Sequence, residues 1–227
     1  MVDEPLEAPT GQRAGTGYLI APDAGPGPGL LVLHSWWGLT DRVRDLCDRF
    51  AALGYTTLAP DLLAGAQPET AAMAEMELGE SDVNAMAALV VSSTHALRSF
   101  SPDPRRPIGV VGFGMGGSWA LWLSARVPAS VSHVVTFYGA QDTDFAASQS
   151  RYQGHWADRD EFVSDDEVVA LHALLRLHGR EVDFHRYPGT RHGFFEDTPD
   201  GVFDGAAAEL AWSRTTAFLA DLVEPAS

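Results

Sequence analysis

Short runs of apolar residues alternate along the chain with longer segments in which apolar residues recur every three or four positions. The short runs are bounded by glycine, proline or polar residues, which is typical of buried strands. They predict strands at Gly17–Ala21, Leu30–His34, Tyr55–Ala59, Ile108–Val111, Val131–Tyr138, Tyr152–Trp156 and Val182–Tyr187. The periodic segments predict helices at Arg42–Leu53, Asn84–Phe100, from Ser118 onward, at Asp165–His178 and at Gly205–Leu222.

This alternation predicts an α/β fold with one central sheet. Strand–helix–strand connections favour parallel neighbours, and their handedness places helices on both faces of the sheet. No repeat, low-complexity tract or linker interrupts the order, so residues 1–227 are expected to form a single domain. A three-layer sandwich of this kind, with a mostly parallel sheet, binds its ligands at the carboxyl ends of the strands.

Charge and composition exclude several classes of protein. The formal net charge is −16 and all 15 basic residues are arginine, without a cluster that would bind phosphates, so nucleic acid is not an expected partner. No apolar stretch approaches the length of a membrane span, and Met1–Pro5 lacks the apolar core of a signal peptide. The single cysteine, Cys47, falls on the apolar face of a predicted helix and is expected to pack as a small core residue. We therefore expect a cytoplasmic protein with no membrane partner, either a monomer or a small homo-oligomer.

The segment Gly112–Gly117 reads Gly-Phe-Gly-Met-Gly-Gly and joins the predicted strand Ile108–Val111 to a helix. Strand, tight turn and helix form the setting of the G-x-S-x-G nucleophile elbow of hydrolases. Here the position of the nucleophile is occupied by Gly114. A phosphate-binding loop is the competing interpretation. Against it, no acidic residue closes a strand about 20 positions later, and no Gly-Lys-Ser/Thr follows, because the chain contains no lysine.

Polar or glycine-rich segments also follow three other predicted strands. They are His34–Gly38, Asp158–Val163 and Pro188–Phe195. Because parallel strands end at one edge of a sheet, these segments are expected to converge there with the glycine-rich turn. Along the chain, the glycine-rich turn comes first, the acidic segment Asp158–Val163 second and the histidine-bearing segment Pro188–Phe195 third. This is the order of nucleophile, acid and histidine in the catalytic triad of α/β-hydrolases. Three such segments in this order favour a hydrolytic site over isolated capping or surface residues.

These segments resemble the dienelactone hydrolase family over nearly the whole chain, from about Gly17 to the final predicted helix. The resemblance is carried by Leu33–Leu39, Gly54-Tyr55, Ala59–Leu62, the glycine-rich turn, Asp160–Val163 and Tyr187–Phe194. It implies an α/β-hydrolase fold in which Asp160, in an Asp-x-Phe-Val match that favours it over Asp158, orients His192 as the general base. The nucleophile position falls on Gly114, and the backbone N–H groups of Trp36 and Met115 would form the oxyanion hole. No cofactor and no metal are expected.

Two departures from the family change the expected nucleophile and the expected substrate. Ser35 stands where family members with a cysteine nucleophile place a glutamate, so the resemblance implies an ancestor with an elbow serine. Glu196 stands where the lactonases hold the substrate carboxylate with an arginine, and the segment Leu62–Leu97 offers no other arginine for that role. Because like charges repel in a partly dry cleft, the expected partner is a small neutral ester or lactone, and not a dianionic lactone.

Several other residues are candidates for the same site. Ser35 is a backup nucleophile, although a turn-forming serine in the oxyanion loop is the more ordinary interpretation. Ser118, one helical turn beyond Gly114, is expected on the packing surface of its helix. The residues predicted to wall an apolar pocket are Trp36, Trp37, Trp156 and Phe194. His34, His155 and Asp160 lie near strand ends, but no short-range ligand motif such as His-x-x-x-His supports a metal site.

Three functions remain open from the sequence alone. In the first, the chain is a hydrolase scaffold that lacks its nucleophile, either as a relic or as an engineered knock-out. Alternatively, it is a non-catalytic protein that binds a small apolar ligand in the same pocket. In the third, the pair His192–Asp160 activates a water molecule in the space left by Gly114, and hydrolysis proceeds without an acyl-enzyme.

Overall fold

One sheet of eight strands organises the chain in the computed structural model, which describes residues 2–3 and 17–223. The strands are β1 (Val2–Asp3), β2 (Gly17–Ile20), β3 (Gly29–Leu33), β4 (Thr56–Pro60), β5 (Ile108–Phe113), β6 (Val131–Phe137), β7 (Arg151–Arg159) and β8 (Val182–Arg191). Their spatial order is β1-β2-β4-β3-β5-β6-β7-β8. β1 and β2 pair antiparallel to their neighbours, and all pairs from β4 to β8 are parallel.

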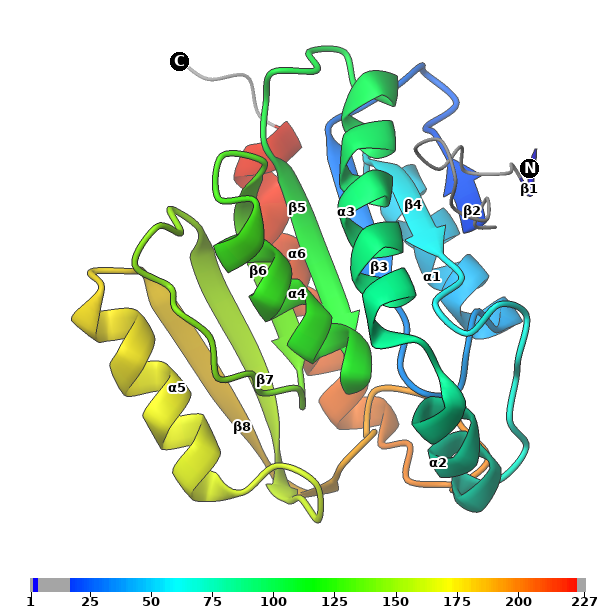
Figure 1. Ribbon diagram of the computed structural model, residues 1–227, viewed down its shortest axis with the longest axis vertical. Coiled ribbons are helices and arrows are strands. Elements are labelled where there is room, and N and C mark those ends of the chain that lie inside the picture. Colours follow the sequence, from blue (N-terminus) through cyan, green and yellow to red (C-terminus); the bar gives the residue numbers. More distant parts are fainter. Residues whose placement is uncertain (1, 4–16, 224–227) are drawn as a thin grey trace.

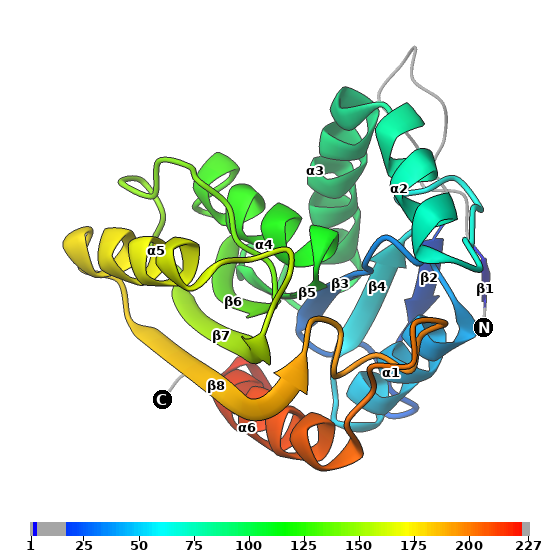
Figure 2. The ribbon, with the colours of Figure 1, turned by 90° about the horizontal axis from the view of Figure 1, so that it is seen from below.

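Helices cover both faces of this sheet and give three layers (Figures 1 and 2). The helices are α1 (Asp41–Ala52), α2 (Ala71–Glu80), α3 (Val83–Phe100), α4 (Met115–Arg126), α5 (Asp165–Leu177) and α6 (Gly205–Val223). Seen from below, α1 and α6 lie on one side of the strands, and α3, α4 and α5 lie on the other (Figure 2). The predicted architecture, a mostly parallel sheet between two helical layers, is confirmed.

Each face of the sheet carries its own hydrophobic core. Val111 on β5 packs with α1 and α6, whereas its neighbour Val110 packs with α3 and α4 on the opposite face. Successive side chains of a strand point to opposite faces, so a strand buried on both sides must be apolar throughout. Cys47 is fully buried among the residues of α1 that face the sheet, as its position in the apolar pattern predicts.

The structure differs from the predicted elements where apolar periodicity is weak. α2 has a single buried residue, Ala74, and so gives no amphipathic signal. β7 and β8 continue beyond their predicted ends to Arg159 and Arg191, because backbone pairing extends the ladder where the side chains are mostly exposed. α4 begins at Met115, three residues before the predicted Ser118.

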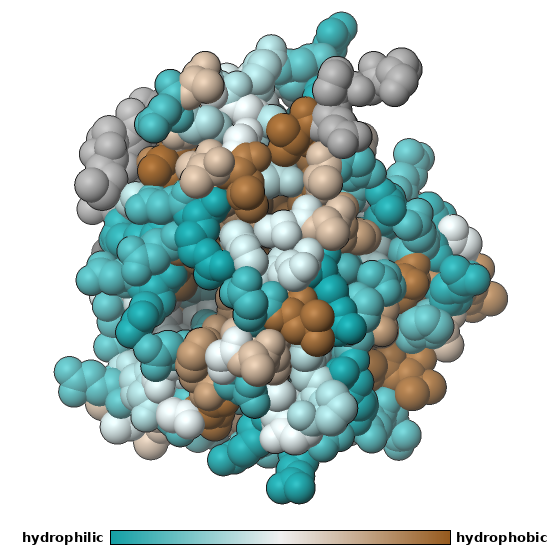
Figure 3. Space-filling view, turned by 180° about the vertical axis from the view of Figure 1, so that it is seen from behind, coloured by the Kyte–Doolittle hydropathy of each residue, from teal (hydrophilic) through white to brown (hydrophobic). Residues whose placement is uncertain are grey.

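The surface over α1 and α6 is mainly polar, with apolar residues in small separate groups (Figure 3). Within residues 2–3 and 17–223, no helix is long and apolar enough to cross a lipid bilayer.

Candidate active site

The candidate site lies at the lower end of the sheet in Figure 1, where β5 ends and α4 begins. Gly114 connects the two elements with φ 49° and ψ −114°, a backbone conformation that is costly for residues with a Cβ atom. Side chains are excluded at the flanking glycines. A Cβ on Gly112 would overlap the carbonyl of Gly116, and a Cβ on Gly116 would overlap the carbonyl of Leu33. The strand and the helix therefore approach as closely as a nucleophile elbow requires.

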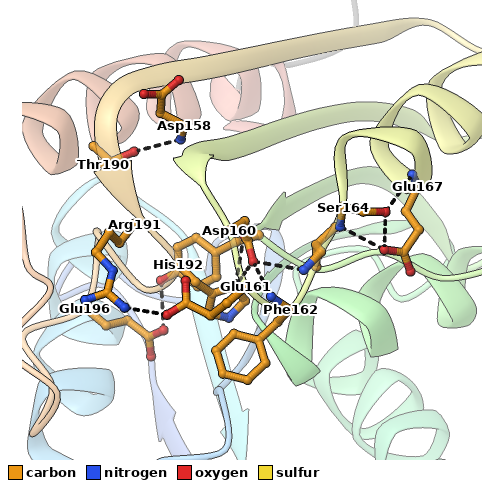
Figure 4. A network of polar contacts seen from close by, with 12 residues as sticks. Asp158, Asp160, Glu161, Phe162, Ser164, Glu167, Thr190, Arg191, His192 and Glu196 are labelled. Atoms are coloured by element: carbon orange, nitrogen blue, oxygen red, sulfur yellow. Dashed lines mark hydrogen bonds and ion pairs between the residues drawn. The ribbon is translucent and has the colours of Figure 1, made fainter.

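Asp160 and His192 are brought together from the ends of β7 and β8 (Figure 4). The Nδ1 atom of His192 lies 2.9 Å and 3.0 Å from the two carboxylate oxygens of Asp160. The same carboxylate accepts hydrogen bonds from the backbone N–H groups of Phe162 and Val163, each at 2.9 Å. Since an ionised carboxylate only accepts, Nδ1 carries the proton and Nε2 of the neutral ring is left as a base.

The environment of Asp160 favours its ionised form. Burial by itself would raise the pKa of this carboxyl group, since only 7% of the side chain is exposed. The hydrogen bond and electrostatic attraction of the His192 imidazole, with the amides of Val163 and Phe162, outweigh burial and lower the pKa of Asp160 below its ordinary value. Asp158, the alternative acid, instead accepts a hydrogen bond from the backbone N–H of Gly189 at 3.0 Å and points away from His192 (Figure 4).

The Nε2 atom of His192 faces the position where a hydrolase would carry its nucleophile. An ideal Cβ built on Gly114 lies 3.6 Å from Nε2 and 3.7 Å from the Cβ of Ser35, which are ordinary van der Waals distances. A side chain at position 114 would therefore fit without displacing either neighbour. The ends of β5, β7 and β8 thus converge on one point, where the elbow residue Gly114 contributes no side chain.

The two residues predicted to form the oxyanion hole, Trp36 and Met115, line the same cavity as this point. Met115 is the first residue of α4, so its N–H group has no partner within the helix and lies at the positive end of the helix dipole. Trp36 lies in the loop that follows β3. Both residues line the same cavity as Gly114 and His192, as the oxyanion-hole prediction requires.

A cavity of about 280 Å³ opens over Gly114 and His192, and it corrects two of the predicted wall residues. Trp36 and Trp37 line this cavity, but Trp156 and Phe194 do not. Trp156 is 3% exposed and packs against Phe184, because its side chain points from β7 into the core beneath α5. Phe194 is fully buried and packs behind the cavity in the core on the other face of the sheet.

Of the two serines near the elbow, Ser118 differs from its predicted position, whereas Ser35 begins a turn as its more ordinary interpretation states, with its carbonyl accepting from the N–H of Gly38 at 3.2 Å. Ser118 lines the cavity instead of the packing surface, because α4 begins early and places it in the first turn, where its hydroxyl donates to the carbonyl of Ala140 at 2.7 Å. Ser35 is buried beside Gly114 and donates its hydroxyl hydrogen to Oε1 of Glu196 at 2.7 Å.

Glu196 and Tyr138 form a polar cluster with Ser35 that the sequence did not reveal. The hydroxyl of Tyr138 donates to Oε2 of Glu196 at 2.8 Å, so each carboxylate oxygen receives one hydroxyl donor. Burial raises the pKa of Glu196, and burial beside that carboxylate raises the pKa of Tyr138. Tyr138 directly follows β6, so the rule that sites collect at strand ends could have identified it.

The histidines at other strand ends have structural partners. His34 donates from Nδ1 to the carbonyl of Ser35 at 2.7 Å, and its Nε2 accepts from the N–H of Leu62 at 2.9 Å. His155 is hydrogen-bonded to the hydroxyl of Tyr187 and lies in the core. Among the described residues, no group of three or more His, Cys, Asp or Glu side chains is placed to hold a metal ion.

The fold is that of an α/β-hydrolase, and comparison with known proteins specifies the family. The sequence pattern of the dienelactone hydrolase family matches residues 16–223. Protein usf of Aquifex pyrophilus is 31% identical over 211 residues, which cover 89% of this chain and 91% of that protein. The chain belongs to the dienelactone hydrolase family.

Solved structures show the same fold at lower sequence identity. A dienelactone hydrolase-like promiscuous phosphotriesterase from metagenomic libraries superposes with a TM-score of 0.84 at 22% identity, covering 97% of this chain and 98% of that one. Esterase 2 of Thermogutta terrifontis superposes with a TM-score of 0.74 at 15% identity, covering 98% and 95%. At these identities the likeness establishes the fold and not the substrate.

Proposed function

We propose that this protein is a dienelactone hydrolase-like scaffold for carboxylic esters or lactones that lacks the nucleophile. The observation that carries the proposal is the 3.6 Å between Nε2 of His192 and an ideal Cβ on Gly114. The base, its orienting acid and the amide donors surround a position from which only the attacking atom is missing. This arrangement supports a site that binds an ester and polarises its carbonyl, but that forms no acyl-enzyme.

The backbone conformation at position 114 supports a fold that persists without the nucleophile. The nucleophile of an elbow sits in a strained backbone conformation that costs a residue with a side chain about 1–3 kcal/mol. Glycine removes that cost at position 114, where φ is 49°. Catalysis responds differently, since a site without its triad nucleophile retains only about 10³–10⁴-fold acceleration over water. Loss of the nucleophile therefore leaves the structure in place and impairs the reaction.

The lining of the cavity supports the exclusion of anionic substrates. It contains the carboxylate of Glu196, and no arginine is among the described residues that line it. A substrate carboxylate would have to be desolvated beside a negative side chain without a cation to neutralise it. The proposed ligand is accordingly a small ester or lactone without a negative charge.

The experiment that tests this function is the substitution Gly114→Ser, assayed on a panel of aryl and alkyl esters with the native chain as control. The introduced hydroxyl would lie beside Nε2 of His192, so hydrolysis should rise by at least about 10²-fold. If the native chain already matches the serine variant, the nucleophile lies elsewhere. If the folded variant stays inert on the whole panel, the site is a non-catalytic binding site.

A further inference from the structure

The cavity above Gly114 has an unusual combination of walls. Three carboxylates and four aromatic rings line it, and no arginine is among its described lining residues. These residues are Glu167, Glu196, Asp200, Trp36, Trp37, Tyr138 and Phe162. Glu167 and Asp200 are exposed at the mouth, whereas Glu196 is partly buried and reaches the hydroxyl of Ser35 beside the elbow. The negative charge of the cavity therefore extends from its mouth to the vicinity of Gly114.

Glu196 is the inner carboxylate and has acceptor capacity left for a ligand. A carboxylate offers about four acceptor positions, of which the hydroxyls of Ser35 and Tyr138 occupy two. Glu196 belongs to none of the ion pairs formed among residues 17–223. A carboxylate removed from water without a cation is stabilised by any positive charge that enters the cavity.

The aromatic walls favour the same kind of ligand. The ring of Trp36 meets Trp37 edge to face at 5.7 Å between centroids and meets Phe162 in the same way at 5.3 Å. Faces of aromatic rings attract organic cations, and several rings around one cavity recognise ammonium groups in this manner. Aromatic faces next to a carboxylate bind an ammonium group better than a neutral group of the same shape.

We propose that the cavity selects small esters that carry an ammonium group, and that Glu196 is the residue that determines this specificity. The ester carbonyl would lie toward the amide of Met115, and the ammonium group would lie between Glu196 and the aromatic walls. A volume of about 280 Å³ limits the ligand to a short acyl chain and a compact cationic group. The inference rests on the proposed function for the ester part of the ligand, and it narrows the ligand from any ester without a negative charge to one that carries a positive charge.

Three acetate esters of similar size test the inference on the native chain. Acetylcholine carries a quaternary ammonium group, 3,3-dimethylbutyl acetate is its uncharged counterpart, and 4-acetoxybutanoate is an anion. Isothermal titration calorimetry should give an affinity for acetylcholine at least about tenfold higher than for the uncharged ester. The anion should bind more weakly than both.

Glu196→Gln removes the charge and keeps the shape, so the preference for acetylcholine should fall to within about threefold. Glu209→Gln makes the same change at an exposed position of α6 and should leave the preference unchanged. Phe162→Leu removes one aromatic wall and should reduce the preference as well. Because Phe162 is 55% exposed, this variant keeps the test valid even if Glu196→Gln does not fold.

Two results would overturn the inference: equal binding of the cationic and uncharged esters, or an unchanged preference in Glu196→Gln and Phe162→Leu. These outcomes are independent of the proposed function, because binding to the native chain requires no turnover. Conversely, an inert Gly114→Ser variant that still prefers acetylcholine would reject the hydrolase proposal and retain the ammonium site.

Discussion

The Nε2 atom of His192 lies 3.6 Å from the point that a Cβ atom would occupy on Gly114, while Nδ1 of the same ring is held by Asp160. The distance is an ordinary van der Waals contact, so the elbow can accept a side chain without rearrangement of the base. In the proposed function, the histidine is therefore oriented toward the position of a nucleophile, and Gly114 provides no side chain there.

Gly114→Ala should fold and lose about 1–2 kcal/mol in free energy of unfolding, because a Cβ at φ 49° is strained although it meets no clash. Gly112→Ala, two residues away, should be far more destabilising, since its Cβ would overlap the carbonyl of Gly116. Urea denaturation followed by circular dichroism measures both changes. Equal stability of the two variants would contradict the close approach of β5 and α4.

The lowered pKa of Asp160 predicts how the stability of the protein depends on pH. A carboxylate with a lower pKa in the folded state adds stability above its unfolded pKa of about 3.9, and this contribution is lost as the pH falls toward the folded pKa. The difference in unfolding free energy between the native chain and Asp160→Asn should therefore be larger at pH 6 than at pH 3.

A matched control for this measurement is Asp158→Asn, which changes the same group two residues away at an exposed position. Its difference from the native chain should vary less with pH than that of Asp160→Asn, since Asp158 does not contact the imidazole of His192. A pH dependence as large in the control would assign the effect to the general charge of the chain and not to the pair.

The sequence predicted the parts of the fold that burial dictates. The strand Ile108–Val111 is apolar at every non-glycine position because both faces of the sheet are covered there, and the helix bearing Cys47 shows its buried stripe. Backbone pairing also forms the exposed ends of β7 and β8, and such pairing leaves no apolar signature. α2 went unpredicted for a related reason, since only Ala74 of its residues is buried.

The site was predictable where local motifs place residues at strand ends, as for Gly114, Asp160 and His192. It was not predictable where contacts depend on side-chain direction. Trp156 and Phe194 are apolar residues near the same strand ends, but they point into the cores and not into the cavity. The contact between Ser35 and Glu196 joins positions 161 residues apart, and no local pattern marks such a pair.

Covalent labelling distinguishes the two serines that could act as nucleophile. A fluorophosphonate reagent should label Gly114→Ser but not the native chain. The hydroxyl of Ser35 donates a hydrogen bond to Glu196, so we expect no activation of this hydroxyl by His192. Intact-protein mass spectrometry detects the adduct. The double variant Gly114→Ser/Ser35→Ala should still be labelled, whereas labelling of the native chain that disappears in Ser35→Ala would make Ser35 the nucleophile.

A double-mutant comparison tests whether His192 acts as the base for the introduced hydroxyl. In the Gly114→Ser background, His192→Ala should lower kcat/KM for aryl acetates by about 10²–10⁴-fold, which is the usual contribution of a positioned general base. His95→Ala, at an exposed position of α3, should leave the rate unchanged. In the native background His192→Ala should change the rate only if the histidine activates water directly, and turnover would then show no burst phase. A serine variant whose rate survives His192→Ala would show that the 3.6 Å relationship has no catalytic consequence, and the site would then be one that binds esters without attacking them.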